Sequence, residues 1–511
     1  MLARISLGMA VLMVGVLALA FGVSRGSESR LPVATGEAGP AGLSRFYQQK
    51  VTWERCPPGY CTWVRVPLDY RSPQGTSIKL RVKIRLSGSD AQSPKLFVNP
   101  GGPGGSGVEY VDVVSPQLTK RVRAAYDLVG FDPRGIGQSA PVNCLPGPQL
   151  ATLLDLDPDP DTPKEIDRLD RAFAGLGNGC LKRSGEVASH VSTSNVVRDL
   201  DVLRAVMGQE TLNYYGASYG TLIGAGYADR HPRRVGRVVL DGALDPTLTK
   251  ERAGLKQAKG QQNALRSYIK DCVKKPGCPL GDDADGAQDQ LIALIDSLED
   301  KPLKVAGKRK LTEAGALYGI LASLYDRASW PALSAGIKRA VYGDGTFLLA
   351  LADRFFRRGA DGTIKNDLFE VGHAVRCLDD ARTPSSERMS TLADSYEDVS
   401  PVFGRMVAWS TQECADWPLE SVGLDRSLSA TGAAPILIIG STRDPATPYS
   451  GSKELASQLA SGRLITRKGD GHTGYRVGNR CVDRAVDRYL LIEPPTGDLS
   501  CKDEPDKSEE R

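Results

Sequence analysis

Residues 212–220 read LNYYGASYG, and they lead directly into the stretch TLIGAGYADRHP at 221–232. The first stretch is a short apolar strand that enters a sharp turn, and the second has the composition of a helix. Ser218 lies in this turn within a G-x-S-x-G pentapeptide, whose small residues allow the backbone to bend tightly. The pattern predicts a nucleophilic serine above a sheet. The alternative is a glycine-rich turn with an incidental serine, and the flanking strand and helix argue against it.

Further apolar segments that end in turns occur along the chain. They read KLFVNPGG, YDLVGFDPRG, GRVVLDGALDP, APILIIGSTRDP and GRLITRKGDGHTG, beginning at residues 95, 126, 236, 434 and 462. Near-continuous apolar strands that alternate with helices predict a mostly parallel sheet with helices on both faces. We therefore expect an α/β fold.

The middle of the chain has a different pattern, because it is helical and charged between 247 and 430. We expect an inserted helical cap domain there. The core would then consist of a first part and a C-terminal part, at 45–246 and 431–501. A spacer rich in Gly, Pro and Ser at 24–44 and a charged tail at 502–511 complete the division.

The N-terminus carries an uncharged apolar run at 5–23, preceded by Arg4. This pattern is typical of a signal peptide, so residues 1–23 predict export. The run is also about long enough to span a bilayer, which leaves an uncleaved anchor as the alternative. No cysteine lies just after it, so lipoprotein attachment is not supported. We expect a secreted or cell-envelope-associated protein that meets the membrane only through this segment.

The ten cysteines are even in number, which favours disulfides in an exported chain. Neighbour pairing is the simplest arrangement. It joins Cys56 to Cys61, Cys144 to Cys180, Cys272 to Cys278, Cys377 to Cys414 and Cys481 to Cys501. A zinc site would need short CxxC-type spacings, and none occurs in the sequence. We expect no metal and no cofactor.

Overall charge excludes one further class of protein. Lys and Arg number 65 against 61 Asp and Glu, and the net charge of +4 is too small in 511 residues to indicate a nucleic-acid binder. A phosphate-binding loop is also disfavoured, because Gly107 is followed by Val108 and Glu109 rather than by Lys and Ser or Thr. The weak dinucleotide pattern at 135–140 lacks a clear acidic partner about 20 residues later.

A nucleophilic serine needs a general base. The chain has four histidines. His190 precedes the serine, His231 lies in a polar turn just after the nucleophile helix, and His373 lies in the expected cap. His472 follows the last long strand in the glycine-flanked loop GDGHTG, so it is the best placed base.

The base needs an orienting acid, and in this class of fold the chain order is serine, acid, histidine. Asp444 ends a strand 28 residues before His472, and it is the favoured acid. Asp241 and Asp245 follow an earlier strand and could also serve. Thr447 could support Asp444 by hydrogen bonding, or it could be a turn residue.

Acyl transfer also needs donors for the developing oxyanion. The segment NPGGPGGSG at 99–107 follows a strand, and its glycines allow close backbone approach. We expect the N–H groups of Gly102 and of Tyr219, the residue after the nucleophile, to form the oxyanion hole.

Several motifs occur together in one order: VNPGGPGGSG, DLVGFDPRGIGQS, YYGASYGT, CADWP, and RDPATPY before GHTGY. The chain, from about Trp53 to Cys501, resembles the α/β-hydrolase fold and, more narrowly, the secreted actinobacterial tripeptidyl aminopeptidases, relatives of the prolyl aminopeptidases. By this resemblance the nucleophile, acid and base fall on Ser218, Asp444 and His472. The oxyanion loop falls on 101–105, and the paired cysteines of the cap are those at 377 and 414.

The resemblance implies a serine peptidase that acts near a free N-terminus. Such an enzyme must recognise the ammonium group of its substrate, which requires carboxylates in the cap or at the rim of the site. The candidates are Glu109, Glu370, Asp379 and Asp380. An esterase or lipase could use the same triad, and a catalytically inactive binding protein could share the fold. We expect a monomer whose partner is a peptide or protein with a free N-terminus, and no nucleic-acid partner.

Overall fold

The computed structural model of the chain describes residues 30–88, 93–359, 362–364 and 368–503. The expected signal peptide at 1–23 lies outside the described residues, as do 24–29 of the expected spacer and 504–511 of the expected tail. No described helix combines the length and the apolar character needed to cross a membrane.

A ten-stranded sheet forms the centre of the molecule, in the order β1-β2-β3-β5-β4-β6-β7-β10-β11-β12. The strands are β1 (Glu54–Arg55), β2 (Tyr60–Pro67), β3 (Ser77–Arg85), β4 (Lys95–Asn99), β5 (Asp127–Phe131), β6 (Leu212–Ala217), β7 (Val235–Asp241), β10 (Ile436–Arg443), β11 (Gly462–Asp470) and β12 (Leu499–Cys501). Pairing is antiparallel from β1 to β5 and parallel from β5 to β12. The predicted mostly parallel sheet is confirmed.

Helices cover both faces of this sheet, because neighbouring residues of a strand point to opposite sides. Ile438 of β10 belongs to a core cluster with residues of α7 (Thr193–Val206), α8 (Gly220–Arg230) and α17 (Tyr449–Gln458). The next residue, Ile439, belongs instead to a cluster with α3 (Gly107–Val114), α4 (Lys120–Ala125) and α18 (Arg480–Leu491). The short helix α2 (Ser44–Tyr47) adds Phe46 and Tyr47 to the first of these clusters, and η1 (Pro232–Arg234) lies between α8 and β7 in the chain. The sheet is therefore buried from both sides.

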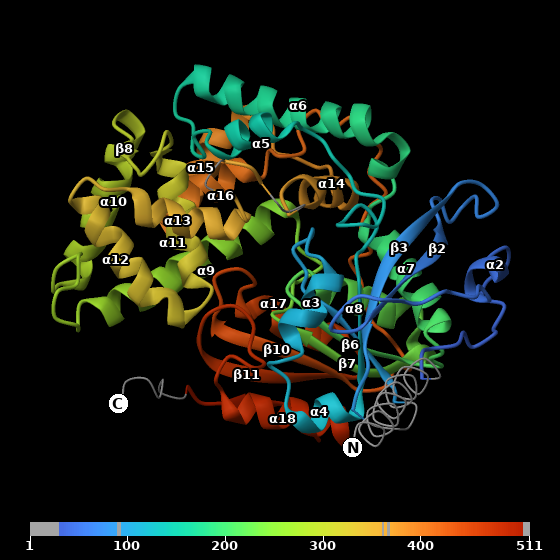
Figure 1. Cartoon of the computed structure of the whole chain (residues 1–511). Coiled ribbons are helices and arrows are strands. Elements are labelled where there is room, and N and C mark those ends of the chain that lie inside the picture. The colour runs from blue at the N-terminus through green and yellow to red at the C-terminus, as the bar shows by residue number, and fades with distance from the viewer. Residues whose placement is uncertain (1–29, 89–92, 360–361, 365–367, 504–511) are drawn as a thin grey trace, which may run out of the picture.

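A layer of helices lies above the sheet (Figure 1), and most of them share an apolar core of their own, whereas α14 packs in the core cluster of the sheet. The layer contains α9 (Lys250–Cys272), α10 (Ala284–Asp300), α11 (Glu313–Leu324), η2 (Arg327–Ser329), α12 (Trp330–Val341), α13 (Thr346–Phe356), α14 (Glu370–Asp379), α15 (Ser386–Val399), α16 (Gly404–Ser410) and the hairpin β8 (Leu303–Lys304) with β9 (Lys310–Leu311). Thr249, Asp283 and Thr312 cap α9, α10 and α11 with side-chain oxygens, which explains where these helices begin.

Two helices from earlier in the chain also belong to this upper layer. Figure 1 shows α5 (Gly147–Leu154) and α6 (Pro163–Ala188) above the other helices. Leu169 and Phe173 of α6 pack in the same core cluster as the helices of residues 250–410. The layer over the sheet therefore draws on the chain before residue 247 as well as after it.

Five disulfides join the ten cysteines in the neighbour pairs suggested by the sequence. They link Cys56 to Cys61, Cys144 to Cys180, Cys272 to Cys278, Cys377 to Cys414 and Cys481 to Cys501. No cysteine of the described chain is free. Disulfides are typical of proteins outside the reducing cytosol.

Candidate active site

Ser218 lies in the turn between β6 and α8, with a φ of 56° in the left-handed region. Its two glycine neighbours make this turn possible. A Cβ at Gly216 would lie 2.5 Å from the Gly220 carbonyl oxygen, and one at Gly220 would lie 2.9 Å from Asn99 Oδ1. A non-glycine residue with a positive φ is strained, and such strain is common at functional sites. The turn therefore places the serine above the sheet in a strained backbone conformation.

Neighbouring strand ends fix the position of this turn. The Ser218 N–H donates to the Asp241 carbonyl oxygen at 2.8 Å, and Ala217 lies beside Asp241 in the pairing of β6 with β7. On the other side, Thr221 donates its N–H and its hydroxyl to the Ser218 carbonyl oxygen at 2.9 and 2.6 Å. The serine main chain is thus bonded both to the sheet and to the first turn of α8.

Asp444 and His472 form a direct pair at the ends of β10 and β11. His472 Nδ1 lies 3.0 and 2.9 Å from the two carboxylate oxygens of Asp444. The Asp444 side chain is fully buried, and that of His472 is 12% exposed. Thr447 donates its hydroxyl to Asp444 Oδ2 at 3.1 Å. The carboxylate can therefore fix the tautomer and orientation of the imidazole.

The electrostatics of His472 suit a general base. Burial by itself lowers the pKa of an imidazole, but the nearby carboxylates of Asp444 and Asp241 outweigh it, so the pKa of His472 is raised above its usual value. Tyr325, just after α11, covers the ring with an edge-to-face contact at 5.2 Å between centroids. Its carbonyl oxygen also accepts the backbone N–H of His472 at 2.8 Å. The helical layer therefore contacts the imidazole directly.

Asp241 shapes the loop that carries the histidine. Its carboxylate accepts the N–H groups of Gly474 and Tyr475 at 2.7 and 2.9 Å and the hydroxyl of Tyr215 at 3.0 Å. Burial raises its pKa to about 6, although these hydrogen bonds act in the opposite direction. Since its hydrogen bonds go to the backbone just after His472, Asp241 fixes the loop that carries the histidine and does not orient the imidazole ring.

Ser218 and His472 lie on opposite sides of the end of β7. Ser218 is bonded to the main chain of Asp241, and a Cβ at the next residue, Gly242, would lie 3.2 Å from His472 Cε1. Among the described residues no hydrogen bond joins the serine hydroxyl to the imidazole. Catalytic hydrogen bonds are often long before substrate binds, so the absence of this bond does not exclude the pair.

The glycine-rich segment after β4 packs against the nucleophile turn. A Cβ on Gly101, whose φ is 84°, would collide with the carbonyl oxygen of Ala217 and lie 2.8 Å from the backbone nitrogen of Tyr219. Asn99 Oδ1 accepts the Gly101 N–H at 2.9 Å. Gly102 also has a positive φ, of 117°. The segment thus brings its backbone beside the Tyr219 N–H, as an oxyanion hole requires.

The other three histidines lie elsewhere in the fold, and all four fall in the described chain. His190 Nδ1 bonds the Glu186 carbonyl oxygen at 2.7 Å, and His231 follows the end of α8. His373 is buried in α14, where its ring meets Trp417 at 5.2 Å between centroids. His472 is thus the histidine that pairs with an aspartate next to the serine turn.

Comparison with known proteins places the chain in a family. Residues 400–501 match a model described as TAP-like protein, and 94–335 match the alpha/beta hydrolase fold. Serine protease Hip1 of Mycobacterium tuberculosis is 35% identical over 454 residues, covering 86% of each chain. Tripeptidyl aminopeptidase of Streptomyces lividans is 33% identical over 484 residues, covering 92% of this chain and 88% of its own. The chain belongs to the tripeptidyl aminopeptidase family of α/β hydrolases. Carboxylesterase B of M. tuberculosis is also similar, at 36% identity over 452 residues and 86% of each chain.

Members of this tripeptidyl aminopeptidase family that act on free N-termini would need carboxylates for the ammonium group. Two of the four candidates form ion pairs near the protein surface. Glu109, in the first turn of α3, pairs with Arg357 at 2.7 Å, and both side chains are more than half exposed. Asp380 accepts from Arg382 at 2.8 and 2.9 Å and also pairs with Arg426.

The other two candidate acids are buried. Glu370 accepts the N–H groups of residues 144 and 145 at 2.8 and 2.7 Å. Asp379 accepts the hydroxyl and the N–H of Thr193 at 2.5 and 3.0 Å, and the same hydroxyl lies 2.5 Å from the Tyr219 hydroxyl. Burial raises the pKa of Asp379 to about 7, against the effect of the Thr193 hydrogen bonds. Asp379 therefore lies at the end of a chain of polar groups that begins at the hydroxyl of Tyr219, the residue after Ser218.

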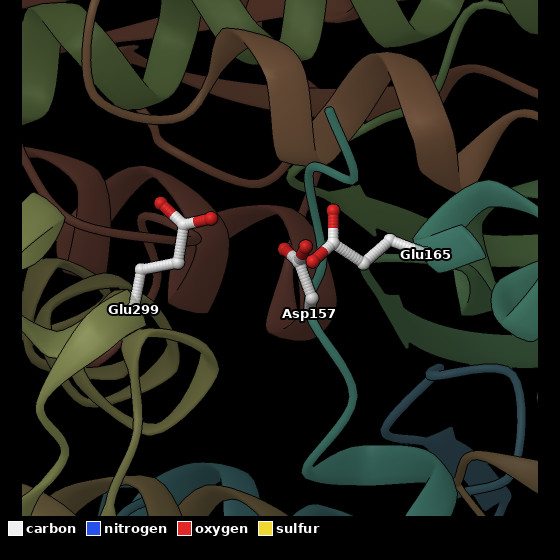
Figure 2. A group of neighbouring side chains, drawn as sticks. All are labelled: Asp157, Glu165 and Glu299. Carbon is white, nitrogen blue, oxygen red and sulfur yellow. The ribbon is translucent and has the colours of Figure 1, made fainter. Parts of the chain in front are cut away.

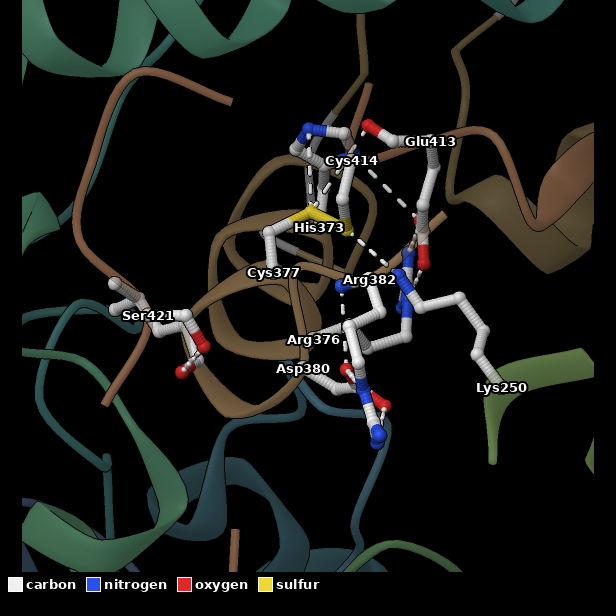
Figure 3. Close-up of a disulfide and its surroundings, with 10 residues drawn as sticks. Lys250, His373, Arg376, Cys377, Asp380, Arg382, Glu413, Cys414 and Ser421 are labelled. Carbon is white, nitrogen blue, oxygen red and sulfur yellow. Dashed lines mark hydrogen bonds and ion pairs between the residues drawn. A yellow bond between two sulfur atoms is a disulfide. The ribbon is translucent and has the colours of Figure 1, made fainter. Parts of the chain in front are cut away.

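The disulfide between residues 377 and 414 lies among charged side chains of the helical layer (Figure 3). Lys250 Nζ donates to Cys414 Sγ at 2.8 Å. Arg376 donates twice to the Glu413 carboxylate, at 2.8 and 2.6 Å. Burial opposes ionisation of Glu413, yet the Arg376 charge lowers its pKa well below the usual range. These contacts fix α14, which carries two of the candidate acids, to the segment after α16.

Sequence reasoning missed two parts of the site. Tyr325 has no motif around it, and its contact with His472 arises from the packing of α11 over the sheet. The loop-holding role of Asp241 could have been suspected, because it ends a buried strand next to the nucleophile strand. The sequence offered it instead as an alternative acid.

Proposed function

We propose that the protein is a secreted serine peptidase that releases short peptides from the free N-terminus of peptides or proteins. The observation that carries this proposal is the buried Asp444–His472 pair beside the strained turn of Ser218. The relatives named as a serine protease and as tripeptidyl aminopeptidases support peptide bonds as the target. Residues 247–430 would serve as the cap over a catalytic core formed by 45–246 and 431–501.

The proposed reaction proceeds through an acyl-enzyme. Ser218 Oγ attacks the scissile carbonyl carbon while His472 Nε2 takes the hydroxyl proton, and Asp444 holds the imidazole through Nδ1. The N–H groups of Gly102 and Tyr219 stabilise the negative oxygen. His472 then protonates the leaving amine, and a water molecule attacks the acyl-enzyme with the same histidine as base. Collapse of that second intermediate frees the serine.

Recognition of the substrate's N-terminus is assigned to a carboxylate, and Glu109 is the preferred candidate over Glu370, Asp379 and Asp380. Glu109 follows the oxyanion segment directly in α3. Its ion pair with Arg357 is exposed, and exposed pairs contribute only about 0–1 kcal/mol. A substrate ammonium group could therefore replace the arginine at little energetic cost.

Export is the proposed route of the protein to its substrate. The five disulfides support an oxidising compartment. A signal peptide at 1–23 would direct the chain there, and the mature protein would act as a monomer.

The deciding experiment is a substrate panel with the purified mature chain. Aminoacyl-, dipeptidyl- and tripeptidyl-p-nitroanilides are compared with their N-acetylated forms, with Ser218→Ala as the inactive control. We expect hydrolysis of an unblocked substrate to exceed that of its acetylated form by at least tenfold. Equal rates for the two forms would contradict the aminopeptidase assignment.

A second candidate function is a carboxylesterase, which the similarity to Carboxylesterase B favours. The same panel tests it with p-nitrophenyl esters of short acids. Ester hydrolysis with no measurable anilide hydrolysis, and loss of both in Ser218→Ala, would favour the esterase.

A further inference from the structure

An acidic loop joins α5 to α6, and it reads DLDPDPDTPKE at 155–165. It meets the end of α10 and the start of α11 in the helical layer. Figure 2 shows Asp157 and Glu165 with their carboxylates directed toward each other and Glu299 of α10 on the facing side. One carboxylate oxygen of each of these three residues lies within 4.8 Å of the others, and the same holds for Asp157, Asp159 and Glu313.

Glu313 is the unusual member of this acidic cluster. The residue is only 8% exposed, and the charged groups around its carboxylate in the described chain are the acids Asp157, Glu299, Asp296 and Asp161. Its carboxylate lies at the start of α11 and faces Asp157 and Asp159. Buried carboxylates normally have a partner, because an unpaired one is costly.

Protein cations near the cluster are already engaged. The charge of Arg405 reaches Asp159, but its guanidinium bonds Asp394 at 3.2 Å and Glu397 at 3.4 Å. Glu165 uses one oxygen to cap α6, where it accepts the N–H and the hydroxyl of Thr162 at 3.0 and 2.6 Å. Glu165 also interacts with Asp161 through hydrogen bonds. The cluster thus presents several carboxylate oxygens to one place without a matching positive charge from these groups.

We propose that Asp157, Asp159 and Glu313 bind a calcium ion, with oxygens of Glu165 and Glu299 at the outer side. The candidate ligands are all carboxylate oxygens, which a hard cation prefers, and Ca²⁺ takes about 6–8 oxygens in flexible geometry. Mg²⁺ demands a near-ideal octahedron and usually keeps several waters, which suits three separate segments less well. Extracellular calcium modules bind with dissociation constants of roughly 10⁻⁴–10⁻³ M, and the proposed export is compatible with that range.

The position of the ion makes its role structural. It would join the 155–161 loop to the end of α10 and the start of α11. The 12 residues of α11 span about 18 Å, and Tyr325 over His472 lies at the far end. A tripeptide is only about 10 Å long when extended, so its ammonium group cannot reach the cluster from the serine. The calcium site is therefore separate from recognition of the substrate's N-terminus.

Direct binding is the first test. The mature chain is treated with EDTA, desalted, and dialysed to equilibrium against ⁴⁵Ca²⁺ at constant ionic strength. We expect one ion per chain with a dissociation constant on the order of 10⁻⁴ M, weakened at least tenfold in Glu313→Gln and in Asp159→Asn. Asp289→Asn removes an exposed acid from α10 and should bind like the wild type. No saturable binding, or equal affinity in the three variants, would overturn the proposal.

Thermal unfolding provides the second test, and it does not depend on catalysis. Calcium should raise the Tm of the wild type in a saturable way, since a ligand bound only by the folded state stabilises it. In EDTA, Glu313→Gln should melt no lower than the wild type, because the isosteric amide removes the repulsion between this carboxylate and its acidic neighbours. Its Tm should not respond to calcium. An equal calcium response in Glu313→Gln, or an equal response of the wild type to magnesium, would contradict the calcium assignment.

Discussion

Asp444→Asn tests the proposed catalytic arrangement most directly. Asp444 Oδ1 accepts the N–H groups of Ala446 and Thr447 at 2.9 Å, and Oδ2 accepts the Thr473 N–H at 3.2 Å. Both oxygens also face His472 Nδ1. An asparagine would place an NH₂ group at one of these two positions. Whichever of the two positions the NH₂ group takes, it faces a backbone N–H donor and can no longer accept its hydrogen bond. An NH₂ group that donates to His472 Nδ1 also favours the wrong tautomer of the imidazole.

The size of the effect follows from these contacts. In triads of this type the same replacement lowers kcat by about 10⁴ through the wrong tautomer, and each factor of ten corresponds to about 1.36 kcal/mol. We therefore expect kcat to fall by about 10³–10⁴, or about 4–5.5 kcal/mol. The unmatched backbone donors should lower the free energy of unfolding by about 1–3 kcal/mol.

The assay is kcat on an unblocked tripeptidyl-p-nitroanilide at pH 8, with Tm measured on the same samples. The matched control is Asp245→Asn, the alternative acid from the sequence, whose carboxylate bonds Thr247 and pairs with Lys256. Its kcat should stay within about threefold of the wild type, because it touches neither the serine nor the imidazole. If Asp444→Asn keeps more than a tenth of kcat, or if Asp245→Asn loses as much, the assignment of the acid is refuted.

Three further predictions concern other parts of the site. Gly101→Ala should lower the free energy of unfolding by at least about 2 kcal/mol in a denaturant titration, since a Cβ there collides with the nucleophile turn, whereas Gly343→Ala, with similar φ but open space, should cost less. Because the raised pKa of His472 must be passed before the ring is neutral, kcat/KM should rise with pH through an inflection above 6.5, and an inflection below that value contradicts the stated electrostatics. Glu109→Gln should raise KM at least tenfold for unblocked tripeptidyl substrates but not for acetylated ones. The control Arg357→Gln removes the present partner of Glu109 and should not raise KM. An unchanged KM in Glu109→Gln would remove Glu109 from ammonium recognition.

Much of the fold could be predicted because its signals are local. Buried parallel strands leave continuous apolar runs, and their ends carry the polar residues of the proposed site. Ser218, Asp444 and His472 each follow or end such a strand, so pairing between strands brings them to one edge without any long-range information from the sequence.

The parts that escaped prediction depend on packing between distant segments. Tyr325 reaches His472 only because α11 lies over the sheet, and no periodic pattern within α11 specifies that. Likewise, the acidic loop is visible in the sequence, but its meeting with Glu299 and Glu313 depends on how two helix ends are arranged. The four candidate ammonium-binding acids were chosen by residue type, and the partners that Glu370 has in the fold could not be foreseen.

The two edges of the central sheet have a consequence for the behaviour of the protein at high concentration. An exposed edge strand is a template on which another chain can add a strand and begin to aggregate. Here the sheet ends in β1 and β12, which have two and three residues, and β1 consists of the charged pair Glu54 and Arg55. The disulfide between residues 481 and 501 fastens β12 to α18. Such short, charged or fastened edge strands offer a poor template for intermolecular pairing, which favours a protein that stays dispersed at high concentration.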